Sequence, residues 1–280
     1  MSVIKSIYDP TLNLIDESLD LEKTNSYHLS ILADANKVSL SILNTLNNKY
    51  LAIQSFPYEM EKLTNHIGLF DRQYKSVTCA IAHHRFTLTP SAIFDGEHKN
   101  SLLSFNHPPK NQEEVFTNSF HSLDAKNIFY IPEQVASALR KKLPNVNFIH
   151  NATSLVEGIL IRNKNSSGKI VFADFHSNYF EVLILDEGKL IFSNAFTFNA
   201  PEDIAYYILF LYEQLHLNTD HIELIISGEI EKTSTHHSLL YNYIRHIKFA
   251  TRIDNFSYSY KFKEIDSHKF YSLFNQYLCA

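Results

Sequence analysis

The chain has 280 residues, of which 45% are hydrophobic, and its formal net charge is −5. A typical domain has about 100 to 150 residues, so a chain of this length is expected to form two domains. Surfaces that bind nucleic acid are usually strongly basic. The acidic balance therefore excludes DNA and RNA as expected partners.

The two cysteines, Cys79 and Cys279, do not form the paired framework of a disulfide-rich exported protein. Asp9 and Asp16 interrupt the apolar stretches of the N-terminal region, which therefore lacks the apolar core of a signal peptide. The most apolar run, 204–212, is much shorter than the roughly 20 residues of a membrane helix. We expect a cytoplasmic protein with two free thiols that does not span a membrane.

Residues 27–58 predict a strand meander. Apolar side chains alternate at Val38, Leu40 and Ile42, and a polar turn at Asn47-Asn48 separates them from a second apolar run. Alternation with a period of two is typical of strands that bury one face.

Residues 169–198 predict a second meander, with a turn at 186–188. Its alternating apolar residues are Phe180, Val182 and Ile184. Each meander places an Ala-Asp pair at the end of its first strand, Asp34 and Asp174, which lie 174 − 34 = 140 residues apart, half the chain length. The sequence therefore predicts an internal duplication.

After each meander, helices alternate with short strands, which indicates mixed sheets flanked by helices. In the first half, the predicted elements are strands within 76–90, a helix over 91–105, a strand over 127–132 and a helix over 133–143. In the second half, they are a helix over 201–217, a strand over 221–227, a helix over 238–245, a strand over 247–253 and a final helix over 268–278. We expect Asn199 to cap the helix over 201–217, with Glu202 reaching back to it.

The polar stretch 162–169 is the predicted boundary between the halves. We therefore divide the chain into an N-terminal extension over 1–24, a first half over 25–163 and a second half over 168–280.

A repeated meander with an early aspartate, followed by helices and strands, resembles the duplicated ribonuclease H-like fold of the actin, Hsp70 and sugar kinase superfamily, from about Tyr27 onward. YHLSILADANKVSLSIL, FTLTPSAIF, NIFYIPEQV and the second meander are similar to an uncharacterised bacterial family, a domain of unknown function with an actin-like ATPase fold. A looser similarity exists to the actin-like proteins of pilus assembly and type II secretion, which hold partners at the inner membrane. The resemblance implies an α/β protein with two ribonuclease H-like halves in an actin-like ATPase arrangement.

In nucleotide-binding members of that superfamily, the turn after the first strand of each half cradles phosphates. The resemblance implies a remnant nucleotide site, and its candidate residues are Asp34, Asn36, Gln134, Asp174, Ser177 and Gly228. Phosphate cradles usually need glycine, which allows close approach and positive φ, and neither turn contains one. The adenosine-contacting turn usually has paired glycines, whereas here Gly228 is followed by Glu229.

Two interpretations of Asp34 and Asp174 remain open. They are either metal or phosphate residues facing a cleft, or aspartates that hold tight turns. A third interpretation, a two-metal nuclease that adds Glu181, leaves each half without a full carboxylate set. The fifteen histidines lack the spacing of a metal-ligand motif, so we expect no metal site.

The leading functional hypothesis is a non-catalytic or weakly nucleotide-binding protein that acts through a protein partner or as a homodimer. It assigns no catalytic residue and expects no bound cofactor. The alternative is a working ATPase or kinase that binds ATP and Mg²⁺ between the halves. Fold alone does not separate the two hypotheses.

Overall fold

The computed structural model describes residues 9–57, 64 and 67–280, which form two compact units. Unit 1 comprises Met1–Glu157, Ile253–Glu264 and Ser272–Ala280, and unit 2 comprises Gly158–Arg252 and Ile265–Tyr271. The division falls within helix α4 (Asn151–Arg162), just before the polar stretch at 162–169. Two C-terminal segments group with unit 1, whereas the sequence-based division assigned everything after 168 to the second half. Residues 1–8 of the predicted extension and Tyr58 of the first meander lie outside the described residues.

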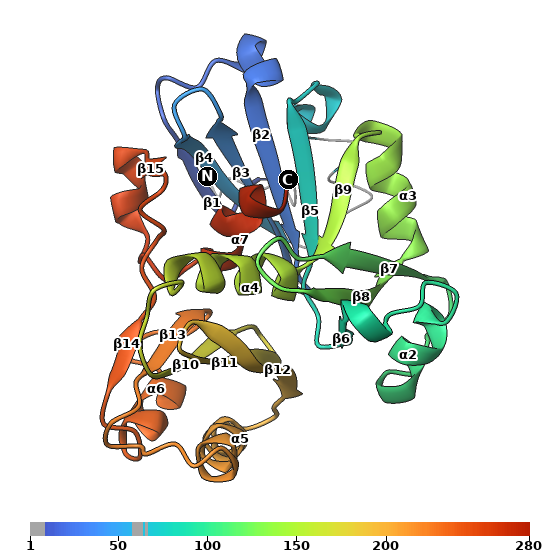
Figure 1. Ribbon diagram of the computed structural model, residues 1–280. Helices are drawn as coiled ribbons and strands as arrows, with labels where there is room; N and C mark the ends of the chain where they lie inside the picture. Colours follow the sequence, from blue (N-terminus) through green and yellow to red (C-terminus); the bar gives the residue numbers. More distant parts are fainter. Residues whose placement is uncertain (1–8, 58–63, 65–66) are drawn as a thin grey trace, which may run out of the picture. The chain divides into compact units, whose positions relative to one another are not determined.

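The main sheet of unit 1 has the strand order β1-β4-β3-β2-β5-β9, and β15 also pairs with β4 (Figure 1). Its strands are β1 (Leu12–Ile15), β2 (Tyr27–Ala33), β3 (Lys37–Asn44), β4 (Lys49–Pro57), β5 (Ser76–Ile81), β9 (Val146–His150) and β15 (Ser257–Tyr258). Strands β2, β3 and β4 are antiparallel neighbours, whereas β5 and β9 run parallel to β2.

The sheet of unit 2 has the order β12-β11-β10-β13-β14. Its strands are β10 (Lys169–Phe175), β11 (Tyr179–Asp186), β12 (Lys189–Thr197), β13 (Leu224–Gly228) and β14 (Ile247–Phe249). The first three are antiparallel neighbours, and the last two run parallel to β10.

The two sheets share one topology, which confirms the predicted duplication. The order β4-β3-β2-β5-β9 in unit 1 matches β12-β11-β10-β13-β14 in unit 2, with the same pattern of parallel and antiparallel pairs. Each second strand has a register shift at the corresponding point, after Ile42 in β3 and after Ile184 in β11. These residues are 184 − 42 = 142 positions apart.

The predicted equivalence of Asp34 and Asp174 is wrong by two residues. The last hairpin pair before the turn is Ala33 with Val38 in unit 1 and Phe175 with Phe180 in unit 2. The offset is again 175 − 33 = 142, so the counterpart of Asp34 is His176. A slip of two residues keeps every side chain on its original face, so alternation alone cannot detect it.

Unit 1 also contains a small three-stranded sheet with the order β6-β8-β7 (Figure 1). Its strands are β6 (Phe86–Pro90), β7 (Glu113–Ser119) and β8 (Ala125–Pro132), of which β7 was not predicted. The Asn118 side chain joins β7 to the main sheet, because its Nδ2 donates to the Phe148 carbonyl at 2.9 Å and its Oδ1 accepts from the His150 N–H at 2.9 Å.

Four predicted helices differ from the observed ones. Besides α4, the described part of the chain contains the helices α2 (Lys99–Asn106), α3 (Glu133–Lys142), α5 (Pro201–Gln214), α6 (Thr235–Tyr241) and α7 (Tyr271–Asn275), together with short 3-10 turns such as Gln276–Cys279. The helix predicted over 91–105 is two pieces, because the Asp95 carboxylate accepts from the Glu97 N–H and turns the chain there. The predicted final helix is likewise α7 followed by a 3-10 turn.

The other two differences concern helix starts. Helix α6 begins earlier than predicted because the Ser234 hydroxyl caps it by accepting from the His237 N–H at 3.2 Å. At the start of α5, Asp203 rather than Glu202 reaches back, accepting from the N–H groups of Asn199 and Ala200. Both are ordinary capping arrangements whose exact position the pattern of polar residues leaves open.

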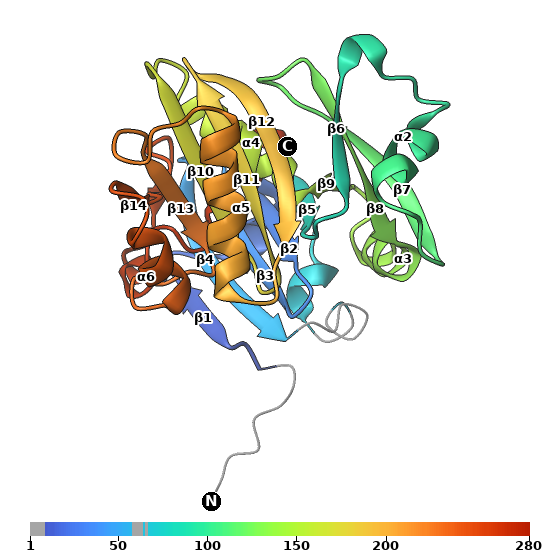
Figure 2. The ribbon, with the colours of Figure 1, turned by 90° about the horizontal axis from the view of Figure 1, so that it is seen from below.

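None of the helices in the described part of the chain is long and apolar enough to cross a membrane. In the core of unit 2, one face of the sheet packs against α5 and α6 (Figure 2). Phe175 belongs to this core and stacks against Phe180 at 5.6 Å, as expected for a side chain that points inward.

Both cysteines are free, as predicted. Cys79 is fully buried, and burial raises the pKa of its thiol far above the usual value. Burial is also the main cause of the raised pKa of the Cys279 thiol. Thiolates are the reactive form, so both groups are expected to be inert in the folded protein.

Titration with a thiol reagent should therefore show slow labelling of the native protein and rapid labelling of two groups per chain in denaturant. The comparison requires freshly purified protein without added reductant. Rapid labelling of Cys79 under native conditions would contradict its burial, and fewer than two groups in denaturant would contradict the free state of both cysteines.

Candidate functional site

The first candidate turn, Asp34–Asn36, joins β2 to β3 in unit 1. The Asp34 N–H donates to the Lys37 carbonyl at 2.9 Å, which closes the turn. The buried Asp34 carboxylate accepts from the N–H of Ala35 at 2.6 Å, whereas Asn36 is exposed. Two backbone donors of this turn are therefore already used within the turn itself.

The matching turn of unit 2, His176–Asn178, joins β10 to β11 and closes in the same way. The His176 N–H donates to the Tyr179 carbonyl at 2.9 Å, and Ser177 is exposed. All six residues of the two turns are described, and none of them has positive φ. Nests that bind phosphate commonly alternate right- and left-handed residues so that successive N–H groups converge. Neither turn has that backbone.

Asp174 is the second-to-last residue of β10 and belongs to a buried polar cluster. Its Oδ1 accepts from the Ser227 hydroxyl of β13, and its Oδ2 is 3.2 Å from His176 Nε2. Glu181 of β11 lies directly across the ladder from Asp174, and its Oε1 is 3.9 Å from the same imidazole nitrogen. The exposed fractions of Asp174, His176 and Glu181 are 2%, 6% and 1%. His176 also stacks on Tyr179 at 4.3 Å.

The charged and polar groups of this cluster interact mainly with one another. Two ionised carboxylates opposite each other on adjacent strands repel, and an imidazole within ion-pair distance of both offsets that repulsion when it is protonated. The Ser227 hydroxyl adds a charge-assisted hydrogen bond. Among the described residues, no group of three or more histidines, cysteines, aspartates or glutamates has the arrangement of a metal site. The cluster can act chemically as a buried proton donor and acceptor. Structurally, it links strands β10, β11 and β13.

Gly228, at the end of β13, is a position where only glycine fits. Its φ is +83°, and it lies opposite Phe175 in the parallel ladder. A Cβ there would meet the Phe175 carbonyl oxygen at a distance that real structures do not show, and the Phe175 nitrogen at 2.8 Å. The next N–H, that of Glu229, donates to the same Phe175 carbonyl at 2.7 Å. Close packing against β10 therefore accounts for this glycine.

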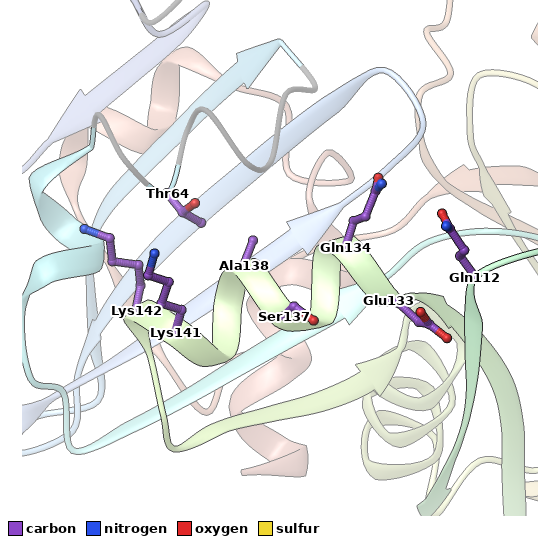
Figure 3. Close-up of a pocket in the computed structure, with 8 residues that line it drawn as sticks. All are labelled: Thr64, Gln112, Glu133, Gln134, Ser137, Ala138, Lys141 and Lys142. Atoms are coloured by element: carbon purple, nitrogen blue, oxygen red, sulfur yellow. The ribbon is translucent and has the colours of Figure 1, made fainter.

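Gln134 lies elsewhere in unit 1, exposed on the first turn of α3. It lines a pocket of about 470 Å³ whose residues Figure 3 draws as sticks. These residues are Thr64, Gln112, Glu133, Gln134, Ser137, Ala138, Lys141 and Lys142. The described lining includes neither Asp34 nor Asn36, so Gln134 and the first turn do not share this pocket.

The structure therefore brings together three of the sequence-predicted residues of unit 2, namely Asp174, Ser177 and Gly228, at one end of β10 and β13. Sequence reasoning did not connect His176 with Asp174. The signal was present, because the alternating triplets Val38-Leu40-Ile42 and Phe180-Val182-Ile184 are themselves 142 positions apart. Aligning those triplets places His176 at the turn and Asp174 in the strand.

Solved structures with the same architecture identify the fold. The chain is 24% identical to a protein of unknown function with an actin-like ATPase fold from Bacteroides thetaiotaomicron, with a TM-score of 0.78 over 83% of this chain and 93% of that one. It is 9% identical to a chain of the PilM-PilN type IV pilus biogenesis complex, with a TM-score of 0.56 over 90% and 97%. For the ethanolamine utilization protein EutJ of Carboxydothermus hydrogenoformans, identity is 6% and the TM-score 0.50, over 95% and 93%.

The chain thus has an actin-like ATPase fold, as the sequence resemblance implied. It belongs to the family described as a protein of unknown function, DUF3822, whose model matches residues 16–247. A search of curated proteins finds no match.

The Gly228→Ala substitution should destabilise the protein by more than about 2 kcal/mol, because the added Cβ meets backbone and the residue needs positive φ. Urea denaturation followed by circular dichroism measures the change. Gly96→Ala is the matched control, since a Cβ there meets nothing within 4 Å. Equal stability of the two variants would contradict the close approach of β13 to β10.

Proposed function

We propose that this chain is a protein-binding member of the actin-like ATPase fold that does not turn over ATP. The observation that carries the proposal is the state of the two turns after β2 and β10. Each turn is closed by its own backbone hydrogen bond, and Asp34 holds a further N–H of its turn. Phosphoryl transfer needs free donors and a metal ion at the phosphates to neutralise developing charge.

The carboxylates give further support. Asp174 is engaged on both oxygens, by Ser227 and by His176, inside a cluster that is almost fully buried. Recruiting it to Mg²⁺ would break these contacts and leave His176 beside Glu181 alone. Asp34 has a structural task of the same kind in its turn. Asp34 therefore fits the turn-holding interpretation, and Asp174 fits a structural role within the sheet, better than either fits the metal-binding one.

Protein contact is the function that remains for such a scaffold. One similar solved structure is the PilM-PilN complex, in which a protein of this fold is bound to another protein. This chain also exposes large apolar side chains, among them Ile191 at 47% and Tyr206 at 63%. Tyr206 stacks on Phe210, which is 43% exposed, so these two aromatic side chains form one exposed apolar surface of the kind that interaction sites use.

Purified protein should release phosphate from ATP no faster than a protein-free control, with or without Mg²⁺. When the ligand concentration does not exceed Kd, binding stabilises a protein by at most about 0.4 kcal/mol. Millimolar ATP is therefore expected to raise Tm by no more than about 1 °C. Thermal-shift titration and phosphate-release kinetics, each with and without Mg²⁺, measure the two quantities.

The same assays on Asp174→Asn test whether any signal comes from this chain, and Asp254→Asn serves as the control because Asp254 is exposed. A large Mg²⁺-dependent rise in Tm, or hydrolysis that Asp174→Asn abolishes and Asp254→Asn preserves, would overturn the proposal. That result would favour the Mg-ATP enzyme.

A further inference from the structure

Strand β12 is an edge strand of the unit 2 sheet (Figure 2). In the described part of the chain it pairs with β11 alone, through eight of its nine residues, and Ile191 is the extra residue at the register shift. Natural edge strands are usually guarded by proline, by charges within the strand or by a covering element. The strand has the sequence KLIFSNAFT, without proline and with its one charge, Lys189, at the start.

The counterpart of β12 in unit 1 shows that an edge of this kind accepts an added strand. Strand β4 occupies the same place in unit 1 and is covered by β1, which runs antiparallel to it. The carbonyls of Leu51 and Ser55 accept from N–H groups that flank β1, both at 2.7 Å. Beyond the register shift, Ala52 corresponds to Phe192, an offset of 192 − 52 = 140. The counterparts of Leu51 and Ser55 are therefore Ile191 and Ala195.

The backbone of β12 offers the same outward groups. The N–H of Ala195 donates to the side-chain oxygen of Asn194 at 2.9 Å, as expected for a donor that points away from β11. Asn194 is exposed and corresponds to Gln54, whose Nε2 donates to Asn13 of the added strand β1 at 2.8 Å. A strand added to β12 would therefore place one of its side chains next to Asn194.

We propose that β12 pairs antiparallel with β12 of a second copy of this chain, in a register centred on Asn194. The proposal deepens the proposed function by naming one protein contact and its partner. An antiparallel pair of identical strands has two-fold symmetry, the commonest symmetry of homodimers. This register sets Asn194 opposite Asn194 of the second copy and Phe192 opposite Phe196, with no like charges facing. The strand is therefore complementary to itself.

Helix α5 supplies a second observation. Its Tyr207 stacks on Phe196 of β12 at 4.7 Å, and the neighbouring Tyr206 packs against Phe210 at 6.2 Å. Tyr206 and Phe210 are 63% and 43% exposed. A two-fold axis perpendicular to the sheet places the α5 helices of both copies on the same face. Pairing through β12 would therefore extend the contact to aromatic side chains that are exposed in one chain.

Sedimentation equilibrium or light scattering across a wide dilution series tests the dimer. The wild type should have twice the mass of one chain. Asn194→Lys and Asn194→Glu should each raise the dimer Kd about tenfold or more, because like charges face each other across the axis. An equimolar mixture of the two variants should form the dimer again, since opposite charges then meet. The control Asn242→Lys, an exposed site outside β12, should leave Kd unchanged.

A monomeric wild type would overturn this interface, and so would a dimer that both Asn194 variants preserve or that their mixture does not restore. Binding of β12 to a strand of a different protein would appear as the monomeric outcome. These results are independent of the ATP assays. A monomer without ATP turnover would contradict only the proposed interface. A dimer that hydrolyses ATP would contradict only the proposed function.

Discussion

Strands β2 and β10, the first strands of the two duplicated five-strand cores, are hydrogen-bonded on both sides, and the positions of the candidate turns follow from that ladder. Strand β2 lies between antiparallel β3 and parallel β5, and β10 lies between β11 and β13. Every residue of β2 is buried. Such a strand cannot slide without breaking two sets of hydrogen bonds, so the turn after it is fixed in place. The close approach of Gly228 to Phe175 shows that β13 is packed tightly against β10, which also fixes the end of β10 in place.

The same ladder explains the polar cluster of unit 2. Because Asp174 and Glu181 are cross-strand partners on one face, folding brings two carboxylates together out of water. Burial of that pair without compensation would be costly. His176 and Ser227 supply the compensation, each from a position that the ladder itself determines. An aspartate near the end of the first strand is therefore compatible with a stable fold that has no ligand at this point.

Sequence alone predicted the architecture because its signals are periodic and repeated. The alternation in both meanders, the turns and the half-chain spacing sufficed for two sheets with one topology. The pairing of Asp34 with Asp174 failed because a matching Ala-Asp dipeptide outweighed the alternating triplets, and a shift of two leaves alternation intact. Strand β7 carries polar residues at Glu113, Glu114 and Asn118, so its pattern does not indicate a strand. The cluster around Asp174 joins residues 53 positions apart, a contact that only the parallel pairing of β10 and β13 creates.

The two units also differ in what covers the edge opposite the parallel strands. In unit 1 the edge strand β4 carries β1 and β15, which come from segments near the two ends of the chain. In unit 2 the corresponding strand β12 has no such addition within the described residues. Strands β1 and β15 are the described main-sheet strands that lie outside the duplicated five-strand cores. Both already belong to unit 1. A further strand on β12 would have to come from outside the described segments, and β12 of a second copy supplies one with matching length, direction and side chains. Duplication created two equivalent edges, and the chain itself closes one of them.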